Sequence, residues 1–170
     1  MGSKEVKAMK SCLLGLGFLA VALVSMRIFS CRSRMQQDTF ENPEASHKIL
    51  ITGTTSEFKD AVTEGIVNRY KDTCQIEIVP PGELKGIDHA DYSSIVIMDE
   101  LRMGKTFGGS TGELAQKVEN KDKVILFITA GKRDWQFSAE GIDAITSASE
   151  EGEERSVIEK ISARIDGLIK

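Results

Sequence analysis

The sequence predicts an α/β domain with a doubly wound, parallel, five-stranded sheet in strand order 2-1-3-4-5, preceded by a single N-terminal hydrophobic helix. Three observations lead to this prediction. Apolar, strand-like runs alternate with helical patterns, which is typical of βαβ units. Some of these runs are apolar throughout and others alternate with polar residues, as expected for central and edge strands respectively. Residues 11–31 are almost wholly apolar.

The apolar stretch at residues 11–31 is interrupted by Arg27. As a helix it would be roughly 30 Å long, about the thickness of a bilayer's hydrocarbon core. We therefore expect residues 1–34 to be a single-pass membrane anchor with basic flanks, in contact with lipid. The alternatives are a cleaved signal peptide and a lipoprotein signal ending at Cys31, although no clear cleavage motif follows the apolar run. Because both flanks are basic, the positive-inside rule does not assign the side of the membrane.

Composition divides the rest of the chain in two. Residues 35–46 are polar and contain Pro43, which predicts a tether, and residues 47–170 form the globular domain. Residues 1–46 carry six basic and four acidic side chains, so the domain carries a net charge of about −6, against −4 for the whole chain. An acidic domain is a poor partner for nucleic acid.

The first half of the domain contains two strands and one helix. Residues 49–51 are apolar, and residues 74–78 alternate strictly, which predicts a second strand with one solvated face. Between them, apolar residues at helical spacing predict a helix over residues 57–71. Thr54 and Glu57 have the spacing of a capping box at its start.

The second half contains the remaining elements. Residues 95–98 and 124–128 are apolar throughout, and residues 142–146 form a short fifth strand. A second helix begins near Ser110, and an amphipathic helix over residues 151–169 closes the chain, with Ser149 as its N-cap. The loop between the second and third strands is short, so the helix there is short or missing.

Ligands of such sheets bind outside the carboxyl ends of the strands, at the point where the strand order reverses. Three loops meet there: residues 52–56, 99–109 and 129–137. The first of them, Thr52-Gly53-Thr54-Thr55-Ser56, joins a strand to a helix. The first N–H groups of that helix have no internal partner and its dipole adds partial positive charge, so the loop is a natural anion site with hydroxyls to complete a phosphate cradle.

These loops resemble those of the flavodoxin family over nearly all of residues 47–170. The Thr-Gly-Thr-Thr turn at residues 52–55 and the helix after it are similar to the family's phosphate loop. Residues 91–97 resemble the family's lead into the third strand, and residues 104–131 contain stretches similar to its third helix and fourth strand. The closest similarity is to the menaquinone-dependent protoporphyrinogen oxidase branch.

The resemblance implies a bound flavin mononucleotide (FMN). It implies that Thr52, Gly53, Thr54, Thr55 and Ser56 hold the phosphate. It also implies that the loops containing Met103, Gly104, Lys105, Gly131 and Trp135 enclose the isoalloxazine ring, with Trp135 stacked on it. Catalytic side chains are unknown, because in such a protein the flavin supplies the chemistry.

Other motifs are weaker. Gly104-Lys105-Thr106 lacks the earlier glycine of a P-loop, since Asp99 stands there. Asp99 and Thr129 resemble positions of a response-regulator receiver domain, which leaves a degenerate receiver as an alternative. The two histidines lack a third ligand at metal spacing, so no metal site is expected.

Two functions follow from the sequence. The first is a membrane-tethered flavodoxin-like protein that binds FMN and transfers electrons, as an FMN-dependent oxidoreductase with a redox protein or a quinone as its partner. The second is a flavin-free domain, flavodoxin-like or degenerate receiver-like, that acts as a binding or scaffolding module at the membrane. Asp99-Glu100 favours the second, because two carboxylates near a phosphate are unfavourable unless solvated.

Overall fold

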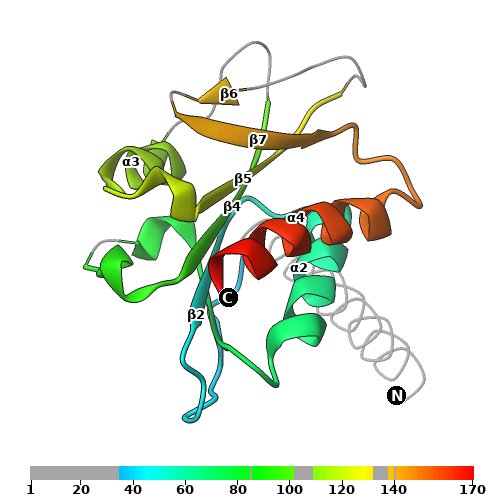
Figure 1. The fold of residues 1–170 in the computed structure, drawn as a ribbon. Coiled ribbons are helices and arrows are strands. Elements are labelled where there is room, and N and C mark those ends of the chain that lie inside the picture. The colour runs from blue at the N-terminus through cyan, green and yellow to red at the C-terminus, as the bar shows by residue number, and fades with distance from the viewer. Residues whose placement is uncertain (1–34, 85, 102–108, 132–137, 140) are drawn as a thin grey trace, which may run out of the picture. The chain divides into compact units, whose positions relative to one another are not determined.

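A computed structural model of the chain describes residues 35–84, 86–101, 109–131, 138–139 and 141–170. These residues form an α/β domain in which one mostly parallel sheet has helices on both faces (Figure 1). No helix within these ranges is long and apolar enough to cross a membrane. The apolar stretch at residues 11–31 lies outside them.

Among the residues that the structure describes, the sheet has seven strands in the order β1-β3-β2-β4-β5-β7-β6. Their bounds are β1 Asp38–Phe40, β2 Lys48–Gly53, β3 Gln75–Val79, β4 Ser94–Glu100, β5 Val124–Thr129, β6 Ser138–Ala139 and β7 Ile142–Ser147. The five parallel strands β3, β2, β4, β5 and β7 have the order that the sequence predicts. The predicted number of strands is corrected from five to seven, because β1 and β6 add antiparallel strands at the two edges.

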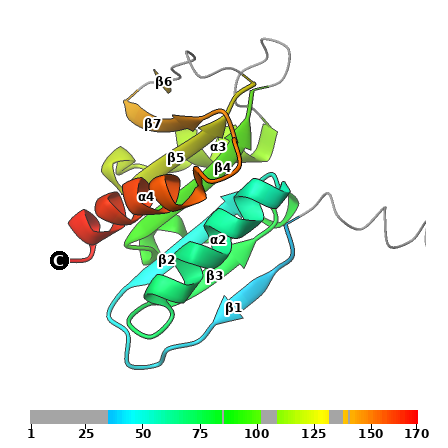
Figure 2. The ribbon, with the colours of Figure 1, turned by 90° about the vertical axis from the view of Figure 1, so that its right-hand side faces the viewer.

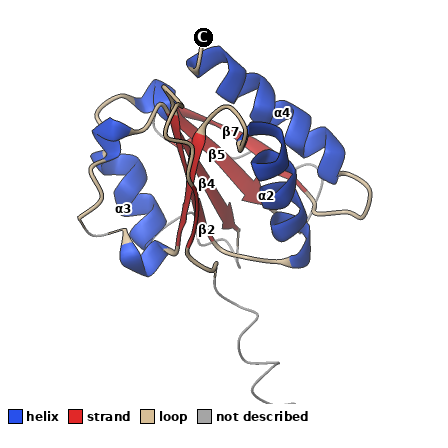
Figure 3. Ribbon diagram, turned by 90° about the horizontal axis from the view of Figure 1, so that it is seen from below, coloured by secondary structure: helices blue, strands red, loops and turns tan. Residues whose placement is uncertain are grey.

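Helices cover the two faces of the sheet unequally. Helices α2 (Glu57–Tyr70) and α4 (Glu154–Leu168) lie on one face and α3 (Gly109–Lys117) on the other (Figures 2 and 3). Strands β2, β4 and β5 are buried along nearly their whole length because both of their faces are covered. The remaining helical turns within the described ranges are three short 3-10 helices: η1 Pro81–Glu83, η2 His89–Asp91 and η3 Lys121–Lys123.

No α-helix joins β3 to β4, where η1 and η2 provide the described turns, so the prediction of a short or missing helix is confirmed. This explains the alternation in β3, whose Ile76 and Ile78 enter the core beneath α2 while Glu77 is only partly buried on the opposite face. Tyr92 donates a hydrogen bond to the Glu77 carboxylate, and Lys48 Nζ lies 3.0 Å from it. Burial alone would raise the pKa of Glu77, but these two bonds outweigh it and hold the pKa below its usual value.

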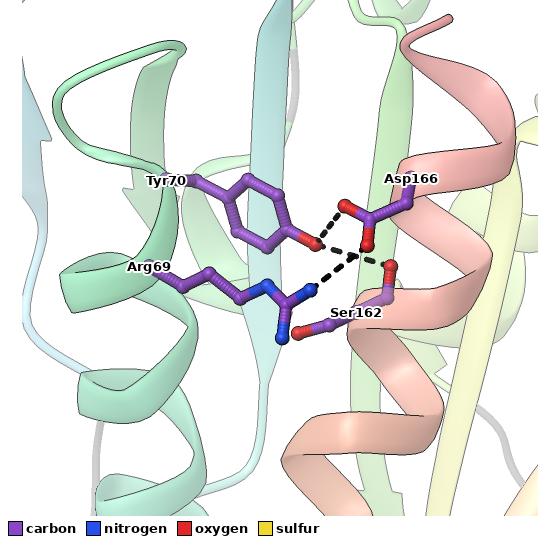
Figure 4. A network of polar contacts seen from close by, with 4 residues as sticks. All are labelled: Arg69, Tyr70, Ser162 and Asp166. Carbon is purple, nitrogen blue, oxygen red and sulfur yellow. Dashed lines mark hydrogen bonds and ion pairs between the residues drawn. The ribbon is translucent and has the colours of Figure 1, made fainter.

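Helices α2 and α4 pack closely. A Cβ on Gly65 would lie 2.3 Å from the Ile158 side chain, so a glycine allows the approach. At the end of α2, the Tyr70 hydroxyl shares its single proton between the Asp166 carboxylate, at 2.6 Å, and the Ser162 carbonyl oxygen, at 3.0 Å (Figure 4). Arg69 contacts the other Asp166 oxygen at 2.9 Å. Burial, then the bond to Asp166, raise the pKa of Tyr70 to about 12.

We expect both tyrosines of the chain to ionise at a higher pH in the folded protein than in the unfolded chain. Burial and then the bond to Glu77 raise the pKa of Tyr92 as well, and the chain has only these two tyrosines. Because the folded state favours the neutral Tyr70 phenol, its contribution to stability is complete below pH 10 and declines between pH 10 and 12, by about 1.4 kcal/mol per pH unit. Phenolate absorbance near 295 nm should therefore rise together with unfolding. Tyr70→Phe should reduce the pH dependence, and phenolate absorbance that develops at pH 10 in the folded protein would contradict the prediction.

Two local predictions need correction. The residue that caps α2 is Ser56, not Thr54, and the residue before α4 is Glu153, not Ser149. Residues 38–40 of the segment expected as a tether form β1, which pairs with β3. Met35, at the start of the same segment, is buried in the core beneath α2.

Candidate functional site

The carboxyl ends of the parallel strands meet at one edge of the sheet, called here the carboxyl edge. The last residues of the strands there are Gly53 of β2, Glu100 of β4, Thr129 of β5 and Ser147 of β7. Strands β2 and β4 are neighbours, and the direction of strand order reverses between them. The carboxyl edge between these two strands is therefore the place where a sheet of this type binds ligands.

Gly53 lets the loop after β2 approach β4. Its φ angle is +144°, and a Cβ there would lie 1.8 Å from the Met98 carbonyl oxygen. The N–H of Thr54 donates to that same oxygen at 2.8 Å. Gly53 thus has a steric role between two strands, and the Thr54 N–H is engaged by β4 rather than directed to an anion.

The loop after β2 leads directly into α2. Ser56 is the N-cap, and its Oγ accepts a hydrogen bond from the N–H of Lys59 at 3.3 Å. The helix then packs along the sheet through Phe58, whose ring lies 6.3 Å from that of Phe127 between centroids. The partial positive charge of the helix terminus is therefore fixed at the carboxyl edge.

Lys59 lies in the first turn of α2 and is fully buried. Its Nζ donates to Thr54 Oγ1 at 2.6 Å, which places the ammonium group beside the loop. A lysine in the first turn adds positive charge where the helix dipole is already positive, and burial removes its hydration. A negatively charged group close to the Nζ atom offsets both costs. Lys59 is not among the site residues that the sequence predicts.

Two hydroxyls, one near the end of β2 and one in the loop after it, have no hydrogen-bond partner within the described part of the chain. They are Oγ1 of Thr52, a residue that is 0% exposed, and Oγ1 of Thr55. Buried polar atoms nearly always have partners in folded proteins, so each of these hydroxyls can accept or donate a bond to a bound molecule or water. Thr52 pairs in register with Val79 and Ile97, residues of the core on the α3 face.

The neighbouring strand, β4, ends in two acidic residues, Asp99 and Glu100. Asp99 is 8% exposed, and its Oδ1 accepts the N–H of Glu100 at 2.8 Å. Thr129 Oγ1 donates to the Asp99 carbonyl oxygen at 3.4 Å. The carboxyl edge therefore combines one buried cation on α2 with two carboxylates on β4.

Some of the predicted site residues lie within the described ranges and others lie outside them. The structure brings Thr54 and Ser56 into contact with Lys59 at the start of α2. Thr52 lies in β2 and Thr55 in the loop between β2 and α2, and neither hydroxyl is hydrogen-bonded to Lys59. Gly131 is an exposed bend residue two positions after β5. Four residues lie outside the described ranges and are not placed: Met103, Gly104, Lys105 and Trp135.

The described ranges contain neither a group of metal-ligating side chains nor a reactive cysteine. Within the described ranges, no three His, Cys, Asp or Glu side chains are grouped so that they could hold a metal ion. Cys74 is buried, and burial raises the pKa of its thiol, which keeps it protonated and unreactive.

The fold and the site define the class of protein: an α/β domain with a strand–loop–helix at the reversal point of a mostly parallel sheet. Comparison with family models, with curated proteins and with solved structures finds no match for this chain.

Proposed function

We propose that the chain is a membrane-tethered, flavodoxin-like protein that binds FMN at the carboxyl edge of its sheet and transfers electrons. The strand order and the strand–loop–helix at the first parallel strand support this proposal. The apolar residues 11–31 support attachment to a membrane and a quinone as the redox partner. Bound FMN would supply the electron-transfer chemistry, and the protein supplies binding and orientation.

The observation that carries the proposal is the group of donors around the loop after β2. Lys59 Nζ beside Thr54 Oγ1, the Thr55 hydroxyl and the terminus of α2 are all suited to a phosphate group, and Thr52 lies just before them at the end of β2. FMN ends in such a phosphate. These residues would hold the phosphate, neutralise its charge and exclude water from it.

The absorbance spectrum of the purified full-length protein tests the proposal. We expect flavin bands in the protein as isolated, or on addition of FMN followed by removal of free flavin. Thr54→Asp should lower FMN affinity at least about tenfold, because its carboxylate repels the phosphate and competes for the Lys59 ammonium. Flavin fluorescence during titration measures this affinity.

Thr73→Asp is the matched control, since Thr73 is exposed in the turn before β3, at the opposite edge of the sheet. It should bind FMN as the unaltered protein does. A colourless protein whose spectrum is unchanged after incubation with FMN would refute the proposal.

The second candidate is a flavin-free binding or scaffolding module. Asp99 and Glu100 at the end of β4 favour it, because they place two carboxylates at the same edge as the proposed phosphate. Asp99→Asn with Glu100→Gln distinguishes the two functions. If FMN binds, this double variant should bind it at least as tightly; if neither protein binds FMN, the flavin-free module is favoured.

A further inference from the structure

The connection between β3 and β4 leaves a groove beside α3. Neighbouring parallel strands are usually joined by an α-helix that covers one face of the sheet. Here η1, η2 and irregular chain make the connection, and α3 is the single α-helix described on that face (Figure 3). Turn η1 lies close to α3. Between the connection and α3 there is a groove of about 230 Å³.

The floor of this groove is apolar. It is formed by Pro81, Leu84 and Ile87 of the connection and by Leu114 of α3. Leu114 is 5% exposed and belongs to the core on the α3 face, and Leu84 and Ile87 pack against that core while they remain partly exposed. The core therefore reaches the surface in this groove, where covering it would remove further apolar area from water.

Two glycines leave space in the groove. Gly82 and Gly86 both line it, and a Cβ on either would meet no atom within 4 Å. Pockets that enclose a small molecule usually measure roughly 300–1,000 Å³. A groove of about 230 Å³ is smaller, so it is better suited to a few side chains that project from another protein than to a cofactor.

The walls of the groove are acidic. Carboxylates are exposed on the connection, at Glu83, Asp88 and Asp91, and on α3, at Glu113. Helix α3 has one basic side chain, Lys117, whose Nζ lies 3.9 Å from Glu113 Oε2. Among the described residues of the two walls, carboxylates therefore outnumber ammonium groups. An apolar floor between acidic walls complements an apolar strip flanked by basic side chains.

From these observations we propose that the groove binds a basic amphipathic helix of a partner protein. The helix would lie beside α3, where the connection between β3 and β4 has no α-helix of its own. Apolar side chains at positions i, i+3, i+4 and i+7 of the partner would enter the groove, and lysines or arginines beside them would reach the acidic walls. This interaction depends neither on flavin binding nor on a membrane.

Fluorescence anisotropy tests the proposal with two labelled synthetic peptides and the full-length protein. Both peptides have leucines at positions i, i+3, i+4 and i+7; one has lysines at the remaining positions and the other has glutamates. We expect the basic peptide to bind at least about tenfold more tightly than the acidic peptide, and its affinity to fall as salt is added. Protein-free solution with the same neutral detergent is the blank.

Two pairs of variants locate the binding site. Gly82→Trp fills the groove and should weaken binding of the basic peptide at least about tenfold. Gly167→Trp is its control, since a Cβ there also meets no atom within 4 Å but α4 lies on the other face of the sheet.

Reversal of one charge provides the second pair. Glu113→Lys should weaken binding of the basic peptide roughly threefold. Its control is Glu159→Lys, because Glu159 is similarly exposed and also pairs with a basic residue four positions away, Arg155 on α4. Neither control should change the affinity, and a thermal melt of each variant verifies that it is folded.

Three results would overturn the proposal: no binding of the basic peptide at about 1 mM, equal binding of both peptides, or equal effects of Gly82→Trp and Gly167→Trp. A second copy of the chain is the other possible occupant. Analytical ultracentrifugation detects it: a dimer that Gly82→Trp abolishes would assign the groove to self-association and replace the proposal. No measurement needs FMN, so a failure of the flavin proposal leaves this test intact.

Discussion

Gly53→Ala should destabilise the domain by at least about 4 kcal/mol, a large part of the stability of an ordinary domain. The added Cβ would lie 1.8 Å from the Met98 carbonyl oxygen, an atom of the neighbouring backbone that cannot rotate away. The φ angle of +144° adds strain for any residue with a side chain. The midpoint of urea unfolding, followed by far-UV circular dichroism, measures the effect.

Gly82→Ala is the matched control. Gly82 lies in η1, and a Cβ there would meet no atom within 4 Å. Its urea midpoint should correspond to a change within about 0.5 kcal/mol. If the two substitutions change stability equally, then β2 and β4 do not approach one another as the structure describes.

Lys59→Met should weaken FMN binding roughly 10- to 100-fold and leave riboflavin binding nearly unchanged. A charge-assisted hydrogen bond contributes about 1.5–3 kcal/mol, which corresponds to this range of affinity. Riboflavin lacks the phosphate, so the difference between the two ligands isolates the phosphate contact. Titration of flavin fluorescence gives both dissociation constants, and a thermal melt verifies that the variant is folded.

Lys117→Met is the control for the loss of charge alone, since the Lys117 side chain is 69% exposed on α3. It should leave both affinities unchanged. Inorganic phosphate provides a probe that needs no flavin: it should raise the melting temperature of the unaltered protein more than that of Lys59→Met. If the Lys59→Met and Lys117→Met variants bind FMN with equal affinity, Lys59 does not contact the phosphate.

The central strands could be predicted because their burial on both faces determines their sequence pattern. Strands β4 and β5 are covered on both faces, so residues 95–98 and 124–128 are apolar throughout. Strand β3 lacks a covering α-helix on one face and alternates. Runs that are apolar throughout therefore indicated central strands, and runs that alternate with polar residues indicated outer strands. This difference predicted the order of the parallel strands.

Strand β1 could not be predicted in this way. Its three residues, Asp38, Thr39 and Phe40, show no periodicity long enough to identify. They become a strand because β3 offers an unpaired edge and because Met35 and Phe40 find apolar contacts in the core. Such tertiary causes leave no local signal.

The site was partly predictable. The Thr-Gly turn between a strand and a helix identified the loop, but the cap proved to be Ser56, one of several adjacent hydroxyl residues that could have served. Lys59 was missed because lysine is rarely buried. A signal was nevertheless present: Lys59 has helical spacing to Val62 and Ile66, so it belongs to the buried stripe of α2.

Strand β1 also has a consequence for self-association. Without it, the backbone of β3 would form an open edge of five residues, available to a second copy of the chain. Strand β1 closes that edge with only three residues, and both Asp38 and Thr39 are exposed. So short an outer strand, carrying an acidic side chain, offers few backbone groups to another molecule. Strand β1 therefore makes pairing of two copies of the chain through this edge of the sheet less favourable.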